Sequence, residues 1–347
     1  MFRRTFLQLA FLCLAAISAQ AQLLPASPAP QPQLPPPSDG DPKATTVERV
    51  PTNTIIIKGA EPSASDHSTP LPEDGSISKG VYRNRYLGLS FPLPAGWMET
   101  FDGPPPSDSG GYVLAQLVPA PSFKGPGKGT MLISAQDMFF SRVPARNAVE
   151  LINFSKEHLP SYYEVEHAPS EVTIAGQKFV RFDYKSPAAD LHWYILATEI
   201  RCHAVQFVLT SRDTALLESI IAKLGEMELP PEASAAQGNG GGAVPLCVAN
   251  YARAENITYK VDPNLADRRF NSIPVRIIID TKGHVRHVHV VSAFPDQATK
   301  ITDALLQWTF KPYTRDGQAV EVETGIMFRS SRTDVADPSG RASATND

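Results

Sequence analysis

Histidines are the first residues in this chain whose type and spacing could bind a metal. His287 and His289 stand two apart in "HVRHVHV", so on an extended strand they would project from one face. A zinc site needs three or four ligands, and the sequence places no Cys, Asp or Glu next to this pair. We therefore expect two solvent-facing histidines and no metal site.

Other motifs that resemble catalytic or phosphate-binding sites are incomplete. Cys202 precedes His203, as in a thiolate–imidazole pair, but no third group is placed to orient them. "GPGKGT", residues 125–130, lacks both the Lys-Ser/Thr ending and the preceding strand of a phosphate loop. No G-x-S-x-G stretch and no convincing pair of carboxylates is present. We therefore expect a protein that is not an enzyme and has no cofactor.

The first 21 residues predict export from the cytoplasm. "MFRR" supplies positive charge, Thr5 to Ile17 form a short apolar stretch, and Ala19-Gln20-Ala21 is a small-residue cleavage site. The alternative is an uncleaved anchor, although a spanning helix needs about 20 largely apolar residues and this stretch includes Gln8. We predict a periplasmic or secreted protein, anchored in the inner membrane if residues 1–21 are retained.

Cleavage of this signal would leave Cys202 and Cys247 as the cysteines of the chain. In an oxidising compartment they could form a disulfide that ties the two halves of the chain together. The alternative is two unpaired thiols, one or both of them buried. The charge balance, 32 Lys and Arg against 36 Asp and Glu, leaves no basic patch, so nucleic acid is not an expected partner.

Proline and glycine divide the rest of the chain into segments. Residues 22–80 include "LLPASPAPQPQLPPPSDGDP" and no Phe, Tyr or Trp, which predicts a disordered Pro-rich tether. Within it, "TIIIKG" (54–59) could dock as a strand or could be a sticky patch in a flexible arm. Residues 230–245 are a Gly-rich linker, and residues 332–347 are a polar, disordered tail.

Residues 81–229 have the pattern of an α+β domain with a mostly antiparallel sheet. Strand-like alternating runs follow one another, with helical patterns only at 143–159 and 211–227. "YLGLSFPLPAGW" at the start and "FVLTSRDTALLESIIAKL" at the end resemble the PsbP-like family of exported domains. That resemblance implies a sheet packed with helices and a role in binding or assisting other proteins, without catalytic residues.

Residues 246–331 predict a second small α+β domain. We expect strands at "IPVRIIID", "HVRHVHVVSA" and "AVEVETGIMFRS" and a helix over "DQATKITDALLQ". The pieces "VRIIIDTKGHVRHVHVVSA", "ALLQWTFKP" and "TRDGQAVEVETGIMF" resemble the C-terminal domain of the energy transducer TonB, in order and with appropriate spacing. In this arrangement Trp308 and Phe310 would close the helix onto the sheet, and Pro312 would end the pairing.

The TonB resemblance implies a partner, since such domains hold an extended peptide of an outer-membrane receptor by strand pairing. We predict that the last strand is an exposed edge with a partner-binding face; the alternative is an internal strand whose alternation builds core. The residues of that face are Val320, Val322, Thr324 and Ile326.

These interpretations predict a non-catalytic bacterial protein that binds an envelope or outer-membrane protein or peptide. The alternative function is a membrane-anchored energy transducer of the TonB type for outer-membrane transport.

Overall fold

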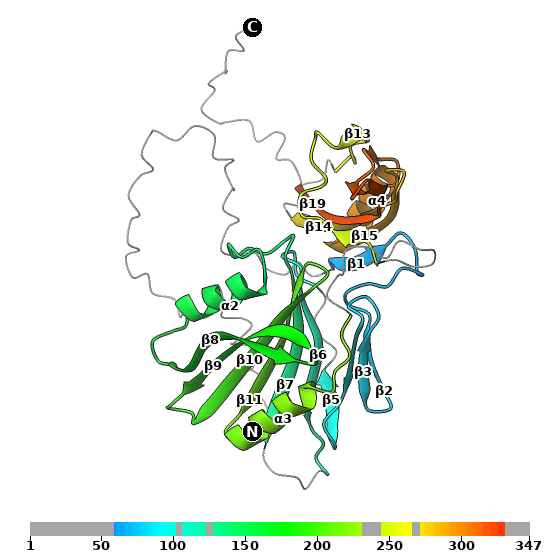
Figure 1. Ribbon diagram of the computed structural model, residues 1–347. Coiled ribbons are helices and arrows are strands. Elements are labelled where there is room, and N and C mark those ends of the chain that lie inside the picture. The colour runs from blue at the N-terminus through cyan, green and yellow to red at the C-terminus, as the bar shows by residue number, and fades with distance from the viewer. Residues whose placement is uncertain (1–58, 102–105, 123–127, 231–243, 266–270, 330–347) are drawn as a thin grey trace, which may run out of the picture. The chain divides into compact units, whose positions relative to one another are not determined.

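The computed structural model describes residues 59–101, 106–122, 128–230, 244–265 and 271–329. All of them belong to one compact unit that begins at Gly59. They form two larger sheets, one three-stranded sheet, two short strand pairs and three helices (Figure 1). The fold is therefore α+β with mainly antiparallel sheets, as the sequence predicted.

The larger sheet is antiparallel throughout, with seven strands in the order β5-β6-β7-β11-β10-β9-β8. Its strands are β5 (Trp97–Phe101), β6 (Gly111–Pro119), β7 (Gly129–Asp137), β8 (Glu164–Ile174), β9 (Gln177–Ser186), β10 (Leu191–Ile200) and β11 (His203–Ser211). Strands β10 and β11 are buried along almost their whole length, which makes them the centre of this part of the fold.

Two capped helices pack on this sheet, and both lie inside the ranges that the sequence predicted. In α2 (Ala148–Glu157), the Asn147 side chain accepts a hydrogen bond from the Glu150 amide. In α3 (Thr214–Leu224), Asp213 accepts from the amides of Ala215 and Leu216. Such caps satisfy amides that a helix leaves unpaired at its first turn. The buried stripe of α3 then joins the core of the larger sheet.

A three-stranded antiparallel sheet completes that core. It consists of β2 (Gly75–Ser78), β3 (Val81–Asn84) and β4 (Leu89–Pro92). Tyr82 and Phe91 are fully buried in the same hydrophobic cluster as α3. The Ser90 amide donates to the Glu228 carbonyl and the Glu228 amide to the Ser90 carbonyl, which ties this sheet to the segment after α3.

The smaller sheet has the order β1-β15-β14-β19-β12. Its strands are β1 (Glu61–Ala64), β12 (Leu246–Cys247), β14 (Ser272–Ile279), β15 (Val285–Ala293) and β19 (Val322–Arg329). All pairs are antiparallel except β12 with β19, which is parallel. The short pairs β13 (Ile257–Tyr259) with β16 (Thr309–Phe310) and β17 (Thr314–Arg315) with β18 (Gln318–Ala319) lie outside this sheet.

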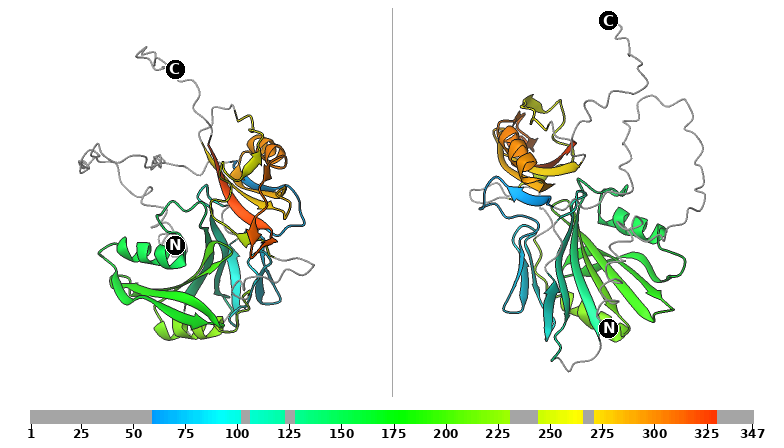
Figure 2. Two further views of the ribbon diagram at one scale, coloured as in Figure 1. Left: turned by 45° about the horizontal axis from the view of Figure 1, so that its top comes forward. Right: turned by 180° about the vertical axis from the view of Figure 1, so that it is seen from behind.

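Helix α4 (Pro295–Leu305) covers one face of the smaller sheet (Figure 2, in orange). The chain then enters the core, where Trp308 is 4% and Phe310 2% exposed. The Trp308 indole donates to the Val261 carbonyl at 2.7 Å. These two aromatic residues therefore close the end of the helix onto the sheet, as the sequence predicted.

The turn between β14 and β15 depends on one glycine. Gly283 has a φ of +90°, and an added Cβ would lie inside contact distance of the Phe310 carbonyl oxygen. The Phe310 amide donates to the Gly283 carbonyl at 2.8 Å, so the two backbones must approach closely. Only glycine permits both the positive φ and this approach.

The predicted tether of residues 22–80 is wrong from Gly59 onward. Residues 61–64 form β1 and residues 75–78 form β2, so ordered structure begins before the predicted boundary at residue 81. This segment needs no aromatic core of its own, because it is held by backbone and side-chain bonds to a strand more than 200 residues away. Composition alone does not report such bonds.

Several predicted segments lie outside the described residues. These are the export signal, the tether up to Lys58, most of "TIIIKG", residues 231–243 of the linker and the tail of residues 332–347. Among the helices that are described, none is both long and apolar enough to span a bilayer.

Candidate functional site: a buried ionic cluster and the edges of the smaller sheet

The hairpin between β10 and β11 turns through Arg201 and Cys202. Ile200 pairs with His203, so the loop has two residues, and their φ angles are +48° and +55°. Tight hairpin loops of this kind usually contain Asn-Gly, because side chains with a Cβ are strained at positive φ. Two non-glycine residues are held here, and both side chains make bonds to the smaller sheet.

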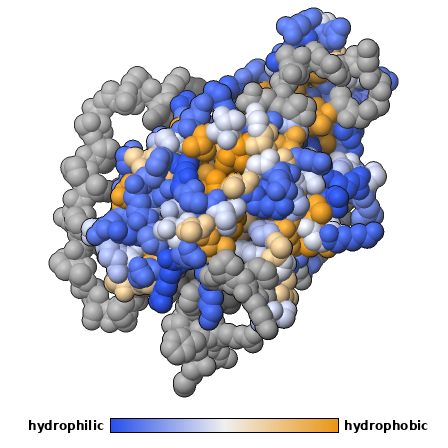
Figure 3. Space-filling view, turned by 60° about the horizontal axis from the view of Figure 1, so that its bottom comes forward, coloured by the Kyte–Doolittle hydropathy of each residue, from blue (hydrophilic) through white to orange (hydrophobic). Residues whose placement is uncertain are grey.

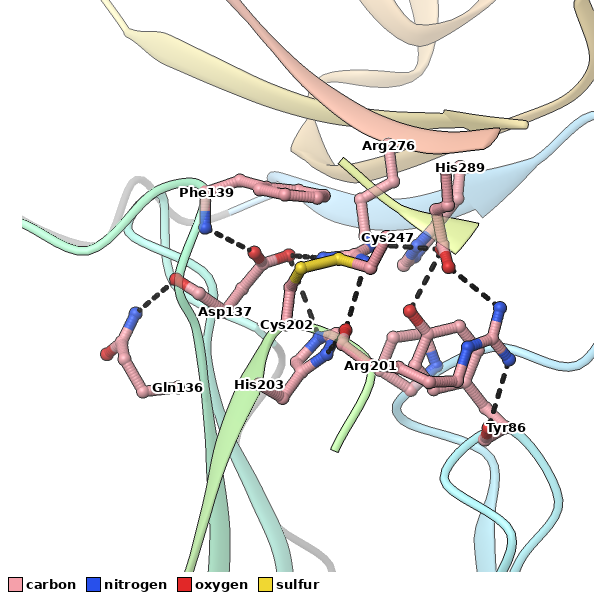
Figure 4. Close-up of polar contacts among 12 residues, drawn as sticks. Tyr86, Gln136, Asp137, Phe139, Arg201, Cys202, His203, Cys247, Arg276 and His289 are labelled. Atoms are coloured by element: carbon pink, nitrogen blue, oxygen red, sulfur yellow. Dashed lines mark hydrogen bonds and ion pairs between the residues drawn. A yellow bond between two sulfur atoms is a disulfide. The ribbon is translucent and has the colours of Figure 1, made fainter. Parts of the chain in front are cut away.

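Arg276 on β14 is the centre of a buried ionic cluster (Figure 4). Its Nη1 donates to Asp137 Oδ2 at 2.5 Å, and its Nε donates to Glu323 Oε1 at 3.0 Å. The side chains of Arg276, Asp137 and Glu323 are 1%, 0% and 4% exposed. Asp137 ends β7 of the larger sheet, while Arg276 and Glu323 belong to the smaller one, so the cluster joins the two sheets.

The hairpin adds a second cation to this cluster. Arg201 Nη2 donates to Glu323 Oε2 at 2.7 Å, and Nη1 donates to the Tyr86 carbonyl at 3.0 Å. The guanidinium also lies 3.8 Å from the centre of the Tyr86 ring, and the Tyr86 hydroxyl donates to Glu323 at 2.9 Å. Glu323 is thereby bonded through both carboxylate oxygens.

These contacts favour the charged forms of Glu323 and Arg276. Burial alone would raise the pKa of Glu323, but the charges of Arg276 and Arg201 and the hydrogen bonds from Arg276 and Tyr86 lower it to about 2. Burial disfavours the charged form of Arg276, yet Asp137 and Glu323 raise its pKa well above the usual value. A buried pair of this kind contributes little net stability, but removing one partner leaves a charge uncompensated.

His203 does not act with Cys202 as a catalytic pair. Burial and the nearby charge of Arg276 lower the pKa of His203 to about 4, so the ring is neutral at pH 7. Its Nδ1 lies 2.9 Å from the Arg201 carbonyl, an acceptor, so Nδ1 carries the proton. The neighbouring Cys202 instead forms a disulfide with Cys247 of β12, with their Cα atoms 6.1 Å apart.

The expectation that His287 and His289 face solvent is wrong. They are 3% and 2% exposed, because the segment between β1 and β2 covers this face of the sheet. His287 Nδ1 lies 2.6 Å from Asp66 Oδ2, and His289 Nε2 lies 2.8 Å from Glu73 Oε1. In the part of the chain that the structure describes, no cluster of three or more potential ligands could hold a metal ion.

Strand β1 occupies one edge of the smaller sheet. It pairs antiparallel with β15, with a bulge between Glu61 and Ser63. The Ser65 amide donates to the Val288 carbonyl at 2.8 Å, and the Val288 amide donates to Ser65 Oγ at 3.0 Å. The N-terminal segment has therefore added itself to the sheet as a strand.

The predicted partner-binding residues do not form an exposed face. Val322 and Thr324 are 1% and 0% exposed, and Ile326 packs against the core. Val320 precedes β19, and its amide donates to the Tyr313 carbonyl. Strand β19 is internal over Val322 and Glu323, where it lies between β14 and β12, so its alternation there builds core.

The other half of β19 has a free edge within the described residues. Beyond Glu323 no described strand pairs with β19 on the side away from β14. On that side the carbonyls of Glu321 and Glu323 accept from Leu246 and Val248. Because alternate peptide groups of a strand point to the same edge, those of Gly325 and Met327 also point there. Met327 is 37% exposed.

The surface has both hydrophilic and apolar regions (Figure 3). Seen from below Figure 1, it is largely hydrophilic, with a group of apolar residues near its centre (Figure 3). The large apolar side chains that are most exposed in the described residues are scattered over the chain: Met98, Val149, Tyr162, Val165, Val244, Tyr259, Leu306 and Met327. Of these, only Met327 belongs to an open edge of the smaller sheet.

Sequence comparisons found no matching family model and no matching curated protein. Among solved structures, cyanobacterial PsbP (CyanoP) from Synechocystis sp. PCC 6803 is similar, with 12% identity and a TM-score of 0.29. The match covers 43% of this chain and 91% of that chain. A TM-score this low carries no argument about fold or function, and none of the comparisons supports the TonB-like part of the sequence interpretation.

Proposed function

We propose that this chain is a non-catalytic exported protein of the bacterial envelope that binds another envelope protein by strand addition to the smaller sheet. The observation that carries this proposal is the open edge of β19 between Gly325 and Arg329. The TonB-like sequence pattern of residues 246–331 motivates the same function, as a resemblance. The alternative, an anchored energy transducer, depends on residues 1–21, which lie outside the described residues.

The opposite edge of the sheet supports strand addition as a binding mode. There β1 is held on β15 by backbone pairing and by the contacts of Ser65 with Val288. An extended segment needs little core of its own to bind in this way, because main-chain hydrogen bonds supply much of the affinity. The same sheet can accept a second segment at β19 by the same chemistry.

The open edge is also held rigidly. Glu323, the last residue of β19 covered by β12, is bonded to Arg276, Arg201 and Tyr86. Gly325 packs against Phe139, so closely that an added Cβ would lie 2.7 Å from the Phe139 Cβ. An edge fixed before binding needs no ordering when a partner docks, which favours affinity.

The partner is an extended segment that pairs with Gly325, Met327 and Arg329. Exposed edges are normally blocked by charge, proline or a covering element, since an open edge invites pairing. Strand β8, at one edge of the larger sheet, is protected in this way. It contains Pro169 and two bulges. It also has four charged or titratable residues near its start and middle: Glu164, Glu166, His167 and Glu171. The described residues of β19 beyond Glu323 contain no proline.

The test compares two substitutions of Met327 in the full chain. A displayed library of extended peptides is selected on the wild-type protein, and the affinity of the selected peptides is measured for each variant. Met327→Pro removes the outward amide without breaking the β14 ladder and should weaken binding by about tenfold or more. Met327→Ala keeps the amide and should change the affinity by less than about threefold. Equal binding to Met327→Pro and Met327→Ala would refute the proposal.

A further inference from the structure

The segment Val244–Ala249, called the flap below, covers the first half of the β19 edge. Its Leu246 amide donates to the Glu321 carbonyl at 2.8 Å, and its Val248 amide donates to the Glu323 carbonyl at 3.0 Å. Only Leu246 and Cys247 pair as strand β12, and they do so in the parallel direction. A parallel pair this short is a weak attachment.

The disulfide supplies the strong attachment of the flap. Cys247 lies in the middle of the flap and is bonded to Cys202 at the tip of the β10–β11 hairpin. Both cysteines are partly exposed to solvent. We therefore expect an external thiol to reach the bond.

The end of the flap has a hinge and an anchor. Asn250 has a φ of +61°, and it and Ala249 are exposed. The next residue, Tyr251, is fixed: its amide donates to Thr324 Oγ1 at 3.1 Å and its hydroxyl to the Lys311 carbonyl at 2.5 Å. A rotation at Ala249 and Asn250 would move the flap without disturbing Tyr251.

The remainder of the contact between the sheets does not depend on the disulfide. Arg276 with Asp137, and Arg201 with Glu323, join the same elements through buried ion pairs. Cutting the disulfide would release the flap and leave the sheets joined.

We infer that the Cys202–Cys247 disulfide is a redox gate on the partner-binding edge of β19. In the oxidised protein the flap covers Glu321 to Glu323, and the open edge begins at Gly325. In the reduced protein the flap turns about Asn250, and the edge extends from Glu321 to Arg329. The partner is then an extended segment that places an apolar residue where Leu246 lay, beside Val322. This inference rests on the proposed function and adds its regulation.

The gate opens by thiol–disulfide exchange with an external dithiol. One thiolate of the dithiol attacks the sulfur of Cys202 or Cys247, the S–S bond breaks, and the other cysteine leaves as a thiolate. The second thiol of the dithiol then attacks the mixed disulfide. The two cysteines gain two electrons and two protons, and the dithiol ends as a disulfide.

The experiment measures amide exchange and peptide binding on the full chain, oxidised and after reduction with dithiothreitol. The peptide probe copies residues 244–252 with serine in place of the cysteine and carries a fluorescent label. On reduction, exchange at Leu246 and Val248 should rise by about tenfold or more, while exchange in β14 and β15 stays within about twofold. The probe should bind the reduced protein about tenfold or more tightly than the oxidised one. Cys202→Ser should match the reduced protein without reductant and should not respond to dithiothreitol.

Three results would overturn the gate. Unchanged exchange at Leu246 and Val248 after reduction would show that the flap is held without the disulfide. Loss of protection throughout β14 and β15 would show that the disulfide stabilises the whole smaller sheet. Equal probe binding in both redox states would show that an open flap frees no site. Library peptides that still distinguish Met327→Pro from Met327→Ala would leave the proposed function standing in each case.

Discussion

The guanidinium of Arg276 donates to the carboxylate of Asp137 across the two sheets, and both side chains are almost completely excluded from solvent. Arg276 belongs to β14 and Asp137 to β7, so this contact fixes the smaller sheet to the strand beside β11. Together with Glu323 and Arg201 it determines which face of the smaller sheet is covered. Because the faces of the smaller sheet are covered, a partner can bind only along its edges.

Arg276→Ala should destabilise the protein strongly. The substitution leaves Asp137 and Glu323 buried without their cation, and the free energy of unfolding should fall by about 3–5 kcal/mol in urea titrations. Arg286→Ala is the matched control on the adjacent strand, because Arg286 pairs with Glu321 but is 37% exposed. That control should cost about 1 kcal/mol or less. Similar losses for both variants would contradict the structural role of the cluster.

Acid should release the N-terminal segment from β15. Burial raises the pKa of both Asp66 and Glu73. The hydrogen bonds that Asp66 accepts, from Thr69 and His287 among others, nevertheless lower its pKa overall. The charge of His289 likewise lowers the pKa of Glu73 overall. Burial lowers the pKa of His287. Each of these groups binds protons more readily after the segment is released from β15 than while it is docked, so stability is lost as pH falls. The loss should begin as pH falls below about 6.5, the ordinary pKa of histidine, because released His287 takes up a proton. It should continue below about pH 4, where the released carboxylates take up protons as well.

Amide exchange in Glu61–Ala64 measures that release. Exchange corrected for the intrinsic effect of pH should rise between pH 7 and pH 4, while exchange in β10 and β11 stays slow. His287→Gln keeps a hydrogen-bonding side chain but cannot take up the proton, so it should flatten the part of the profile near pH 6.5. A profile that is level in the wild type would contradict the prediction.

Gly283→Ala should be far more costly than Gly317→Ala. Both glycines have positive φ, +90° and +78°, but an added Cβ at Gly283 would collide with the Phe310 carbonyl, whereas at Gly317 it meets nothing within 4 Å. The expected losses in unfolding free energy are about 3 kcal/mol or more at Gly283 and about 1–2 kcal/mol at Gly317. Thermal or urea melts of the two variants compare them directly, and equal losses would contradict the close approach of the two backbones.

Removing the disulfide should lower the stability of the folded protein without preventing folding. The bond closes a separation of 45 residues, which in the chain-entropy model corresponds to about 4 kcal/mol. The Cys202→Ala, Cys247→Ala double variant should lose about 2–4 kcal/mol in urea melts and keep a cooperative transition. Loss of the cooperative transition would contradict the view that the ionic cluster holds the sheets together.

Local sequence signals predicted the helices, and they predicted that Trp308 and Phe310 close the helix α4 onto the smaller sheet. Asp213 before an apolar stripe is a cap that acts within one turn, so it can be recognised without knowledge of the fold. Trp308 and Phe310 follow the helix directly and reach a core formed by neighbouring elements.

Long-range pairing could not be read in the same way. Asp66 and Glu73 lie 221 and 216 residues from their histidines, and nothing local marks them as partners. One signal was present in Arg276: a single cation within the apolar strand "VRIII" indicates a buried position that requires a carboxylate. The sequence still names no partner for it. Likewise, the alternation of Val322 and Thr324 fits a core strand and an exposed edge equally well, and the pairing of β12 decides between them.

Amide exchange at Gly325 and Met327, with and without a selected peptide, tests the central claim most directly. Strand addition to β19 predicts that both amides become protected by about tenfold or more on binding, while Val322 and Thr324, whose peptide groups already face β14, change little. Binding that leaves Gly325 and Met327 unprotected, or that protects β15 or the larger sheet instead, would contradict it.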